Sequence, residues 1–372
     1  MRMPAAVMFT TSLLTACFIL AVGEARVVSA QTPAADDGVR LRRIDAGSRT
    51  APASAVVVER GSLVHTAMLY PLDRDGRVQG GNDVRAQATA VLDQFETALR
   101  AAGTGLDRVA RLHVYVADAA AGAAVDEMIA RRFAASSRPA LTRVESRMRH
   151  DGVLVAMDAI AATARHPASG RPERLRVDGL PSTAGAHIAI QPEGPFVIVS
   201  GRAAPGEGDA AATGTMAQLK GDLETAGLGF ADVVQVKAFL TDMSRAAQLE
   251  AVMAATFTGT PPPIVVTEWR GGSAAVEIEL VAAAPGARGS ERVTFVEPIS
   301  ARYSRIARVF AGNPVFVSGL TGASPDPKEQ VRAIFAELGG VVSAAGSDMR
   351  PIAKATYYVS DKGADEEINA IR

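Results

Sequence analysis

The chain has 372 residues, of which 48% are hydrophobic and 21% are charged, and its formal net charge is −1. Such a composition is too apolar for a disordered chain, and the length allows two or three hydrophobic cores. The 39 Lys and Arg residues are spread along the sequence without a dense basic run, which argues against a nucleic-acid partner.

The first 30 residues differ in character from the rest of the chain. Arg2 supplies a positive start, residues 5–22 carry no charge, and residues 28–30 form a small-residue cleavage pattern. This order predicts a secretory signal peptide over residues 1–30, followed by a disordered or extended leader over residues 31–50. We therefore expect a periplasmic or secreted protein, with no membrane contact beyond the export signal.

Two other interpretations of this segment stay open. Residues 14–17 resemble a bacterial lipobox, in which Cys17 would be lipidated to give a lipoprotein. The apolar run is also long enough for an uncleaved membrane anchor. Cys17 is the only cysteine of the chain, so cleavage after Ala30 leaves a mature protein without a disulfide or a thiol nucleophile.

A motif recurs three times after this segment. An Ala-Gly pair ends at Gly103, Gly227 and Gly346, with spacings of 124 and then 119 residues. A period near 120 residues fits a small domain and is far too long for a solenoid unit. The sequence therefore predicts three tandem copies of one α/β domain. Copy one spans residues 51–164, copy two 175–284 and copy three 293–372, with linkers at 165–174 and 285–292.

Hydrophobic periodicity and turn residues give the element order of copy one. The pattern predicts two strands, a helix that Asn82 caps and Gly103 ends, a third strand, a second helix and two closing strands. This order is ββαβαββ. The expected ranges are 55–58, 63–66, 82–103, 109–117, 125–133, 141–146 and 153–161.

Copy three follows the same order but stops early. Its first helix begins with Asp326, Pro327 and Glu329, a pattern typical of a capping box. When Asp361 is aligned with Asp118, copy three is 33 residues shorter than copy one and lacks the two closing strands. We therefore expect copy three to be incomplete and the sequence to be a fragment.

The strand at residues 109–117 has two faces of different character. Its apolar residues alternate with Arg111, His113 and Tyr115, so the two sets lie on opposite faces. The equivalent residues are Gln235, Lys237 and Phe239 in copy two and Lys354, Thr356 and Tyr358 in copy three. A face that is polar at one end and aromatic at the other suits neither open solvent nor a plain core. We expect it to meet another copy, while the apolar face packs under the helices.

Five short motifs, besides the Ala-Gly helix stop, keep the same order in the repeats. They lie at residues 196–201, 236–242, 276–280, 303–304 and 316–319. Together they resemble the Rid (YjgF-like) family of reactive intermediate deaminases. The resemblance implies an α/β domain, a mixed sheet with two helices on one face, that associates as a trimer with ligand clefts between subunits. For this chain it implies an intramolecular pseudo-trimer, because linked copies meet at high effective concentration.

The resemblance also implies which residues act on a substrate. In active family members an Arg after Pro-Ala grips the substrate carboxylate, a Ser-Gly turn faces the imine, and a Glu on the last strand positions the hydrolytic water. The matching Arg positions hold Leu141 and Ile264 here. Arg143 lies two residues further along the strand and is a candidate substitute, although an exposed Arg is the simpler interpretation.

Copy one departs further from the family pattern. Ala67 and Met68 stand where Ser-Gly is expected, and Ala156 stands where copy two has Glu277. The candidate catalytic residues are Glu277 and Glu279, because two carboxylates on one face of a strand raise the pKa of one of them; a solvated outer face is the alternative. The candidate substrate-binding residues are Ser200, Gly201, Arg202, Tyr303, Ser318, Gly319 and Arg143.

The sequence predicts no metal site and no cofactor. The closest histidines, His150 and His166, are 16 residues apart, and a glycine-rich loop at residues 206–211 lacks the acidic partner of a dinucleotide fold. Two functions follow from the resemblance. One is the binding of small-molecule ligands between copies, with hydrolysis of imines or enamines to carbonyl compounds and ammonia. The other is a non-catalytic binding or scaffold module of the same fold. Further self-association stays open.

Overall fold

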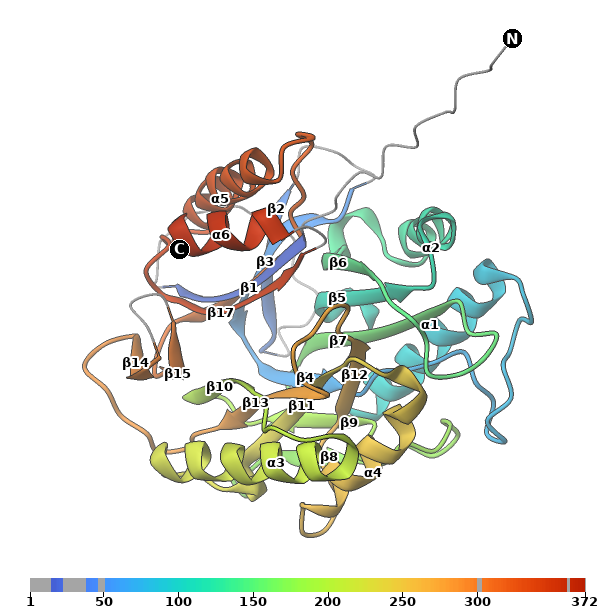
Figure 1. Cartoon of the computed structure of the whole chain (residues 1–372), viewed down its shortest axis with the longest axis horizontal. Coiled ribbons are helices and arrows are strands. Elements are labelled where there is room, and N and C mark those ends of the chain that lie inside the picture. The colour runs from blue at the N-terminus through green and yellow to red at the C-terminus, as the bar shows by residue number, and fades with distance from the viewer. Residues whose placement is uncertain (1–14, 23–37, 46–50, 300–302, 360–361, 372) are drawn as a thin grey trace.

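The computed structural model describes residues 15–22, 38–45, 51–299, 303–359 and 362–371. Figure 1 shows helices at the periphery and strands between them. The expected cleavage pattern at residues 28–30 lies outside the described residues. Within the described ranges, no helix is long and apolar enough to cross a membrane.

Copy one has the predicted order of elements. Asp83, one residue beyond the predicted Asn82, caps the first helix, because its carboxylate accepts hydrogen bonds from two backbone N–H groups of the first turn. Gly103 follows the helix with a φ of 72°, a left-handed conformation that glycine adopts without strain. The elements are β3 (Ala53–Arg60), β4 (Ser62–Thr66), α1 (Val84–Ala101), β5 (Val109–Val116), α2 (Ala119–Arg132), β6 (Ala140–Glu145) and β7 (Val155–Thr163).

Copy two repeats this order. Its core packs Leu219 and Leu223 of the first helix against Val236 and Ala238 of the central strand, and all four are fully buried. The elements are β9 (Ile188–Gln191), β10 (Phe196–Arg202), α3 (Gly208–Thr225), β11 (Val233–Leu240), α4 (Ala246–Ala255), β12 (Ile264–Glu268) and β13 (Val276–Ala283).

Copy three contains β15 (Ser304–Val309), β16 (Asn313–Val317), α5 (Pro327–Ala344), β17 (Ile352–Tyr358) and α6 (Lys362–Ile371). Asp326 caps α5, as predicted, by accepting a hydrogen bond from the N–H of Lys328. The predicted capping box is wrong. Glu329 instead accepts a hydrogen bond from the hydroxyl of Ser324, which holds the approach to the helix.

The first strand of each copy joins the sheet of another copy. β9 pairs antiparallel with β4, β15 with β10, and β3 with β16. This exchange is cyclic and closes the three copies into a ring. The short strands β2 (Arg40–Asp45), β8 (Glu173–Leu175) and β14 (Val293–Pro298) pair with β3, β9 and β15. β2 thus lies in the segment predicted as a leader, and β8 begins within the range predicted as a linker.

One strand comes from the N-terminal segment. β1 (Thr15–Val22) lies between β16 and β17 and is antiparallel to both. In copy one β7 holds the same place between β4 and β5, and in copy two β13 holds it between β10 and β11. Residues from the predicted signal peptide therefore take, in copy three, the sheet position of the last strand of the other copies.

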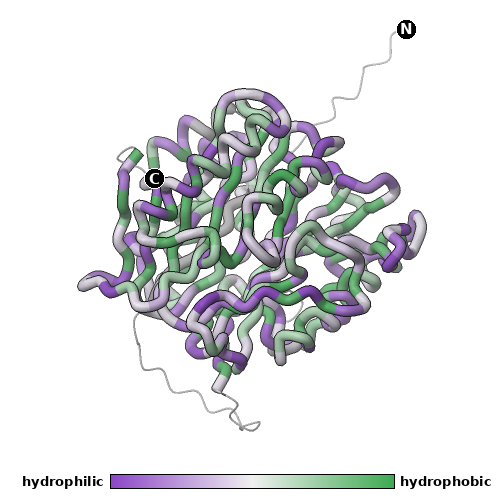
Figure 2. Tube along the Cα trace, turned by 90° about the horizontal axis from the view of Figure 1, so that it is seen from below, coloured by the Kyte–Doolittle hydropathy of each residue, from purple (hydrophilic) through white to green (hydrophobic). Residues whose placement is uncertain are grey.

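Apolar side chains fill both sides of the sheets. One core lies under each helix pair, and a further cluster joins strands of different copies, including Val58, Ile198 and Phe316. In Figure 2, hydrophobic stretches run through the interior and hydrophilic stretches mark several peripheral loops. We call the contact between two neighbouring copies a seam. Each seam lies around the strand pair that joins the two copies: β4 with β9, β10 with β15, or β16 with β3. The seams are therefore part of the interior, and their polar side chains are the candidates for function.

Candidate functional site

The seam between copies two and three brings together several of the predicted site residues. The hydroxyl of Ser200, at the end of β10, donates a hydrogen bond to the carbonyl of Ser304 on β15 over 2.8 Å. Nη1 of Arg305 donates to the carbonyl of Gly201 over 3.2 Å. Tyr303 precedes β15 with 45% of its surface exposed. The pairing of β10 with β15 thus places the Ser-Gly segment beside the Tyr-Ser segment of the next copy.

Glu277 lies on β13 against this Ser-Gly segment. A Cβ at position 201 would overlap the carboxylate of Glu277 in its present position, so the absence of a side chain at Gly201 allows the acid to approach the backbone this closely. Glu277 is half-buried, and its carboxylate makes no hydrogen bond or ion pair with another described residue. Burial raises the pKa of Glu277, the charge of Glu279 raises it further, and Arg305 opposes both effects.

Glu279 lies in a polar cluster where the mixed faces of the three central strands β5, β11 and β17 meet, which we call the axis of the ring. Its carboxylate pairs with Nζ of Lys354 over 2.5 Å, and both side chains are nearly nine-tenths buried. Lys354 belongs to copy three, so this ion pair joins two copies. Of the two predicted catalytic acids, Glu279 is therefore held in the interface, and its charge acts on the pKa of Glu277.

Asp158 is the equivalent of Glu279 in copy one. Asp158 lies opposite His113 as Glu279 lies opposite Lys237, and only 1% of its surface is exposed. It accepts hydrogen bonds from the hydroxyl of Tyr115 at 2.8 Å and from Nδ1 of His113 at 3.2 Å. Burial alone would raise the pKa of Asp158, but the nearby cationic side chains hold it well below its usual range.

Lys237 completes the cluster on the axis. Its ammonium group lies 3.2 Å from the hydroxyl of Tyr358 and within 6 Å of the ring centroids of Tyr115 and Phe239. The mixed faces of the three central strands thus meet one another in this cluster. Sequence reasoning missed Asp158, although a single acid within the otherwise apolar run at residues 153–161 was a signal for a buried charge partner.

The other two seams are closed. The hydroxyl of Ser318 donates to the carbonyl of Ala53 and accepts from the N–H of Leu141, and the N–H of Gly319 donates to the carbonyl of Leu141. These bonds use the polar groups of Ser318 and Gly319 between copies three and one. Between copies one and two an apolar cluster fills the space, made of Met68, Tyr70, Leu72, Tyr115, Val144, Val153, Ala156 and Val265.

Comparison with known proteins gives the family. The model of the family described as endoribonuclease L-PSP matches residues 45–163 and 182–284, more than half of the chain. The chain belongs to this family. The match covers copies one and two, while copy three lies outside it. No curated protein matches the chain.

Solved structures of Rid and YjgF proteins are also similar to this chain. A YjgF-family protein from Neisseria meningitidis is 21% identical over 34% of this chain and 98% of its own, with a TM-score of 0.25. A Rid-family protein from Yersinia pestis is 24% identical over 33% and 98%, with a TM-score of 0.29. A YjgF-family protein from Mycobacterium tuberculosis is 29% identical over 33% and 100%, with a TM-score of 0.24. The family match and the repeated motifs make the chain a Rid (YjgF-like) protein built from tandem copies.

Two arginines predicted to bind substrate in this Rid protein are engaged elsewhere. Arg202 forms a two-pronged ion pair with Asp222, at 2.7 and 2.5 Å, and this hydrogen bonding raises the pKa of Arg202. Arg143 forms an ion pair with Asp126 and lies against Gly122 of α2. Arg143 therefore faces α2 and pairs with an acid there, and its role as a substitute for the missing family Arg stays a prediction.

Arg305 is the guanidinium that the structure places near Glu277. No sequence motif pointed to Arg305, because it lies on the first strand of copy three rather than after a Pro-Ala pair. Its one hydrogen bond with a described residue goes to Gly201, which leaves further N–H donors for a ligand. Within the part of the chain that the structure describes, no group of three His, Cys, Asp or Glu side chains is placed to bind a metal.

Proposed function

We propose that this Rid protein binds small metabolites at the seam between copies two and three and hydrolyses imines or enamines there. One observation carries the proposal. The carboxylate of Glu277 lies half-buried against Gly201, has a raised pKa and makes no hydrogen bond with a described residue. A polar acid without a partner in a partly desolvated place is a feature of general acid–base sites.

The proposed reaction needs one proton-transfer group. Protonated Glu277 donates its proton to the imine nitrogen while water adds to the carbon, and the resulting carboxylate accepts a proton from that water. The carbinolamine then breaks its C–N bond, which releases ammonia and leaves a carbonyl compound. A raised pKa keeps more Glu277 protonated near neutral pH than an ordinary glutamate would be.

Arg305 supports an anionic substrate. The family positions for the carboxylate-binding Arg hold Leu141 and Ile264, and Arg202 is occupied by Asp222. Arg305 retains donors beside Glu277, and a guanidinium holds a carboxylate through charge-assisted hydrogen bonds. We therefore propose that Arg305 binds the carboxylate of a 2-imino acid whose imine faces Glu277.

The test is ammonia release from freshly generated 2-imino acids by the full chain and by Glu277→Gln. Loss of the acid should lower the rate by about 10²- to 10⁴-fold. Glu145→Gln removes an exposed carboxylate at the end of β6 and is the matched control, which should keep the full rate. No release by the intact chain would reject imino-acid hydrolysis, and equal release by Glu277→Gln would reject Glu277 as the catalyst.

A second candidate is binding without catalysis. The closure of the other two seams, where Leu141 and Ile264 stand at the family Arg positions, favours it. If calorimetry shows saturable binding of a 2-oxo acid, weakened by Arg305→Gln, while ammonia release stays at the uncatalysed rate, the chain is a binding module.

We also propose that residues 1–30 direct export, on the charge and hydropathy pattern of that segment. N-terminal sequencing of the protein recovered from a bacterial expression host should begin after Ala30. A lipid-modified Cys17 at the new N-terminus would support the lipoprotein alternative instead, and an intact Met1 in the cytoplasmic fraction would reject both.

A further inference from the structure

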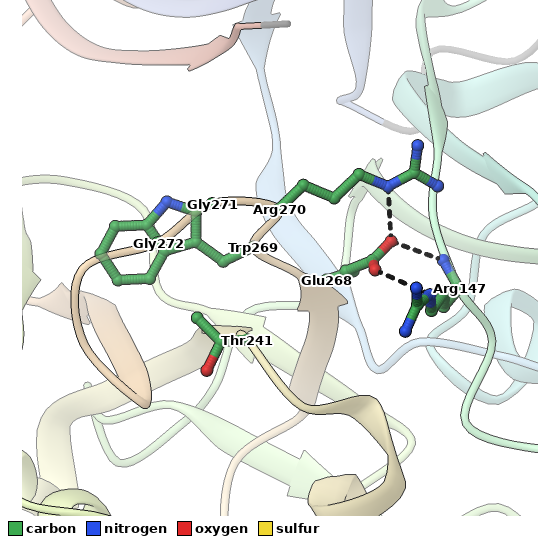
Figure 3. A pocket seen from close by; sticks show the side chains of 7 residues that line it. All are labelled: Arg147, Thr241, Glu268, Trp269, Arg270, Gly271 and Gly272. Atoms are coloured by element: carbon green, nitrogen blue, oxygen red, sulfur yellow. Dashed lines mark hydrogen bonds and ion pairs between the residues drawn. The ribbon is translucent and has the colours of Figure 1, made fainter.

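A depression of about 590 Å³ lies on the surface at the junction of copies one and two. Its lining comes from the loop after β6, the residue after β11, the end of β12 and the turn that follows β12: Arg147, Thr241, Glu268, Trp269, Arg270, Gly271 and Gly272. Figure 3 shows Arg147 and Arg270 on two sides of Glu268, with Trp269 on the other side of the turn. This place is separate from the Glu277 site, because it is formed by a different pair of copies.

Glu268 fixes both arginines. One carboxylate oxygen of Glu268 accepts a hydrogen bond from Nε of Arg270 at 2.8 Å and another from the backbone N–H of Arg147 at 3.0 Å. The other carboxylate oxygen forms an ion pair with Nε of Arg147 at 3.2 Å. The Glu268 side chain itself is only 6% exposed. Its backbone N–H donates to the hydroxyl of Ser146, so copy one holds the acid in place from both sides.

Each guanidinium group contacts Glu268 through its Nε atom, and its terminal nitrogens face solvent. Both side chains are largely exposed, and the described residues provide no further partner for those nitrogens. Asp242 is the other carboxylate near Arg147, and it already accepts hydrogen bonds from the N–H and hydroxyl of Ser244. The depression therefore contains two guanidinium groups that are both held by the Glu268 carboxylate. Their terminal nitrogens remain for a ligand.

We propose that this depression binds a small oxyanion, a phosphate or a carboxylate group, at the solvent-facing terminal nitrogens of Arg147 and Arg270. Paired guanidinium forks match the geometry of these anions. The arginines come from different copies, so a bound anion joins copy one to copy two at the outer end of their closed seam. This site is independent of the proposed catalysis at Glu277.

The single tryptophan of the chain is Trp269, so tryptophan fluorescence, excited at a wavelength that tyrosine does not absorb, reports on this depression alone. The full chain is titrated with inorganic phosphate, with succinate and with chloride at constant ionic strength. Phosphate or succinate should give a saturable change and chloride should not; the more effective of the two identifies the anion class. If the fluorescence stays constant, equilibrium dialysis with radiolabelled phosphate and succinate replaces it, and absence of bound anion overturns the proposal.

Variants separate an oriented site from simple attraction to positive charge. Arg147→Gln and Arg270→Gln should each weaken binding about tenfold or more, because each removes charged hydrogen bonds. Arg131→Gln removes an exposed charge on α2, far from the depression, and should leave binding unchanged. Glu268→Gln adds net positive charge but releases both guanidinium groups. Weaker binding by Glu268→Gln supports the oriented site, while tighter binding, or unchanged binding by the two arginine variants, overturns it.

Discussion

The seam between copies one and two and the seam between copies two and three are built from equivalent strands but contain different chemistry. In the first, Met68 and Ala156 lie in an apolar cluster. In the second, the matching positions hold Gly201 and Glu277, and the acid lies against the glycine. In a symmetric homotrimer the three seams would be identical. Linking the copies in one chain gives each seam its own residues, so one seam can be filled for stability while another keeps an acid.

The largest effect on the free energy of unfolding is expected at the axis, where Asp158 of copy one and Glu279 of copy two occupy equivalent positions. Asp158→Asn should cost about 3–5 kcal/mol, because buried cations lose their counter-charge. The folded-state pKa of Asp158 is depressed, so its contribution is present above the unfolded pKa near 4 and disappears as pH falls through the folded value. Urea unfolding at pH 7 and pH 3 checks this.

Glu279→Gln is the matched variant for that experiment, because it leaves Lys354 without its partner. Destabilisation similar to that of Asp158→Asn would show that both copies depend on the axis in the same way. If both variants unfold at the wild-type urea concentration at pH 7, the buried cluster does not stabilise the ring.

Ala156→Glu would place in the closed seam between copies one and two the acid that the seam between copies two and three holds at Glu277. A carboxyl group in that apolar cluster should cost about 3 kcal/mol. The penalty should grow as pH rises above the unfolded pKa near 4, because folding raises the pKa of the buried acid. Urea unfolding should show little change for Glu277→Ala, the matched removal. Equal stability of Ala156→Glu and wild type would mean that the first seam also accommodates an acid.

A pH effect on stability is expected from His65 of copy one. His65 occupies the position of Ile198 in copy two and Phe316 in copy three, and burial lowers its pKa to about 4. Because the folded state resists protonation of His65, stability should be full above pH 6.5 and fall by about 2–3 kcal/mol toward pH 4. Urea unfolding across this range should show a shallower loss for His65→Gln. An unchanged slope in that variant would assign the acid sensitivity to other groups.

The smallest effect separates the two arginines near the second seam. Arg202→Gln breaks the partly exposed pair with Asp222 and should cost about 1 kcal/mol with little change in imine hydrolysis. Arg305→Gln should instead raise KM for a 2-imino acid and move the pH profile upward, because Arg305 opposes the raised pKa of Glu277. Steady-state kinetics from pH 5 to pH 9 distinguish them, and the reverse pattern would assign anion binding to Arg202.

Much of the fold follows from local sequence pattern. The Ala-Gly pairs predicted helix ends, and Gly103, Gly227 and Gly346 all have φ values in the left-handed region. Two predictions about helix starts needed the structure, because neighbouring polar side chains compete for the same N–H groups. Asp83 rather than Asn82 caps α1, and Glu329 bonds Ser324 instead of closing the capping box.

The site could be predicted only in part. The position of Glu277 followed from the motif, since a repeated strand pattern indicates which face a side chain occupies. The roles of Arg143, Arg202 and Arg305 did not follow, because a flexible guanidinium pairs with whichever carboxylate the tertiary packing brings near. Sequence alone does not supply those distances.

By itself the sequence determined that three α/β copies follow one another and that their central strands carry one apolar and one mixed face, because hydrophobic period and turn residues act over short distances. Only the tertiary structure decided which strand completes which sheet and which seam keeps its acid. Strand exchange and charge pairing join residues more than a hundred positions apart, such as Ser318 with Ala53. Their free energies depend on burial and distance, which exist only once the ring has closed.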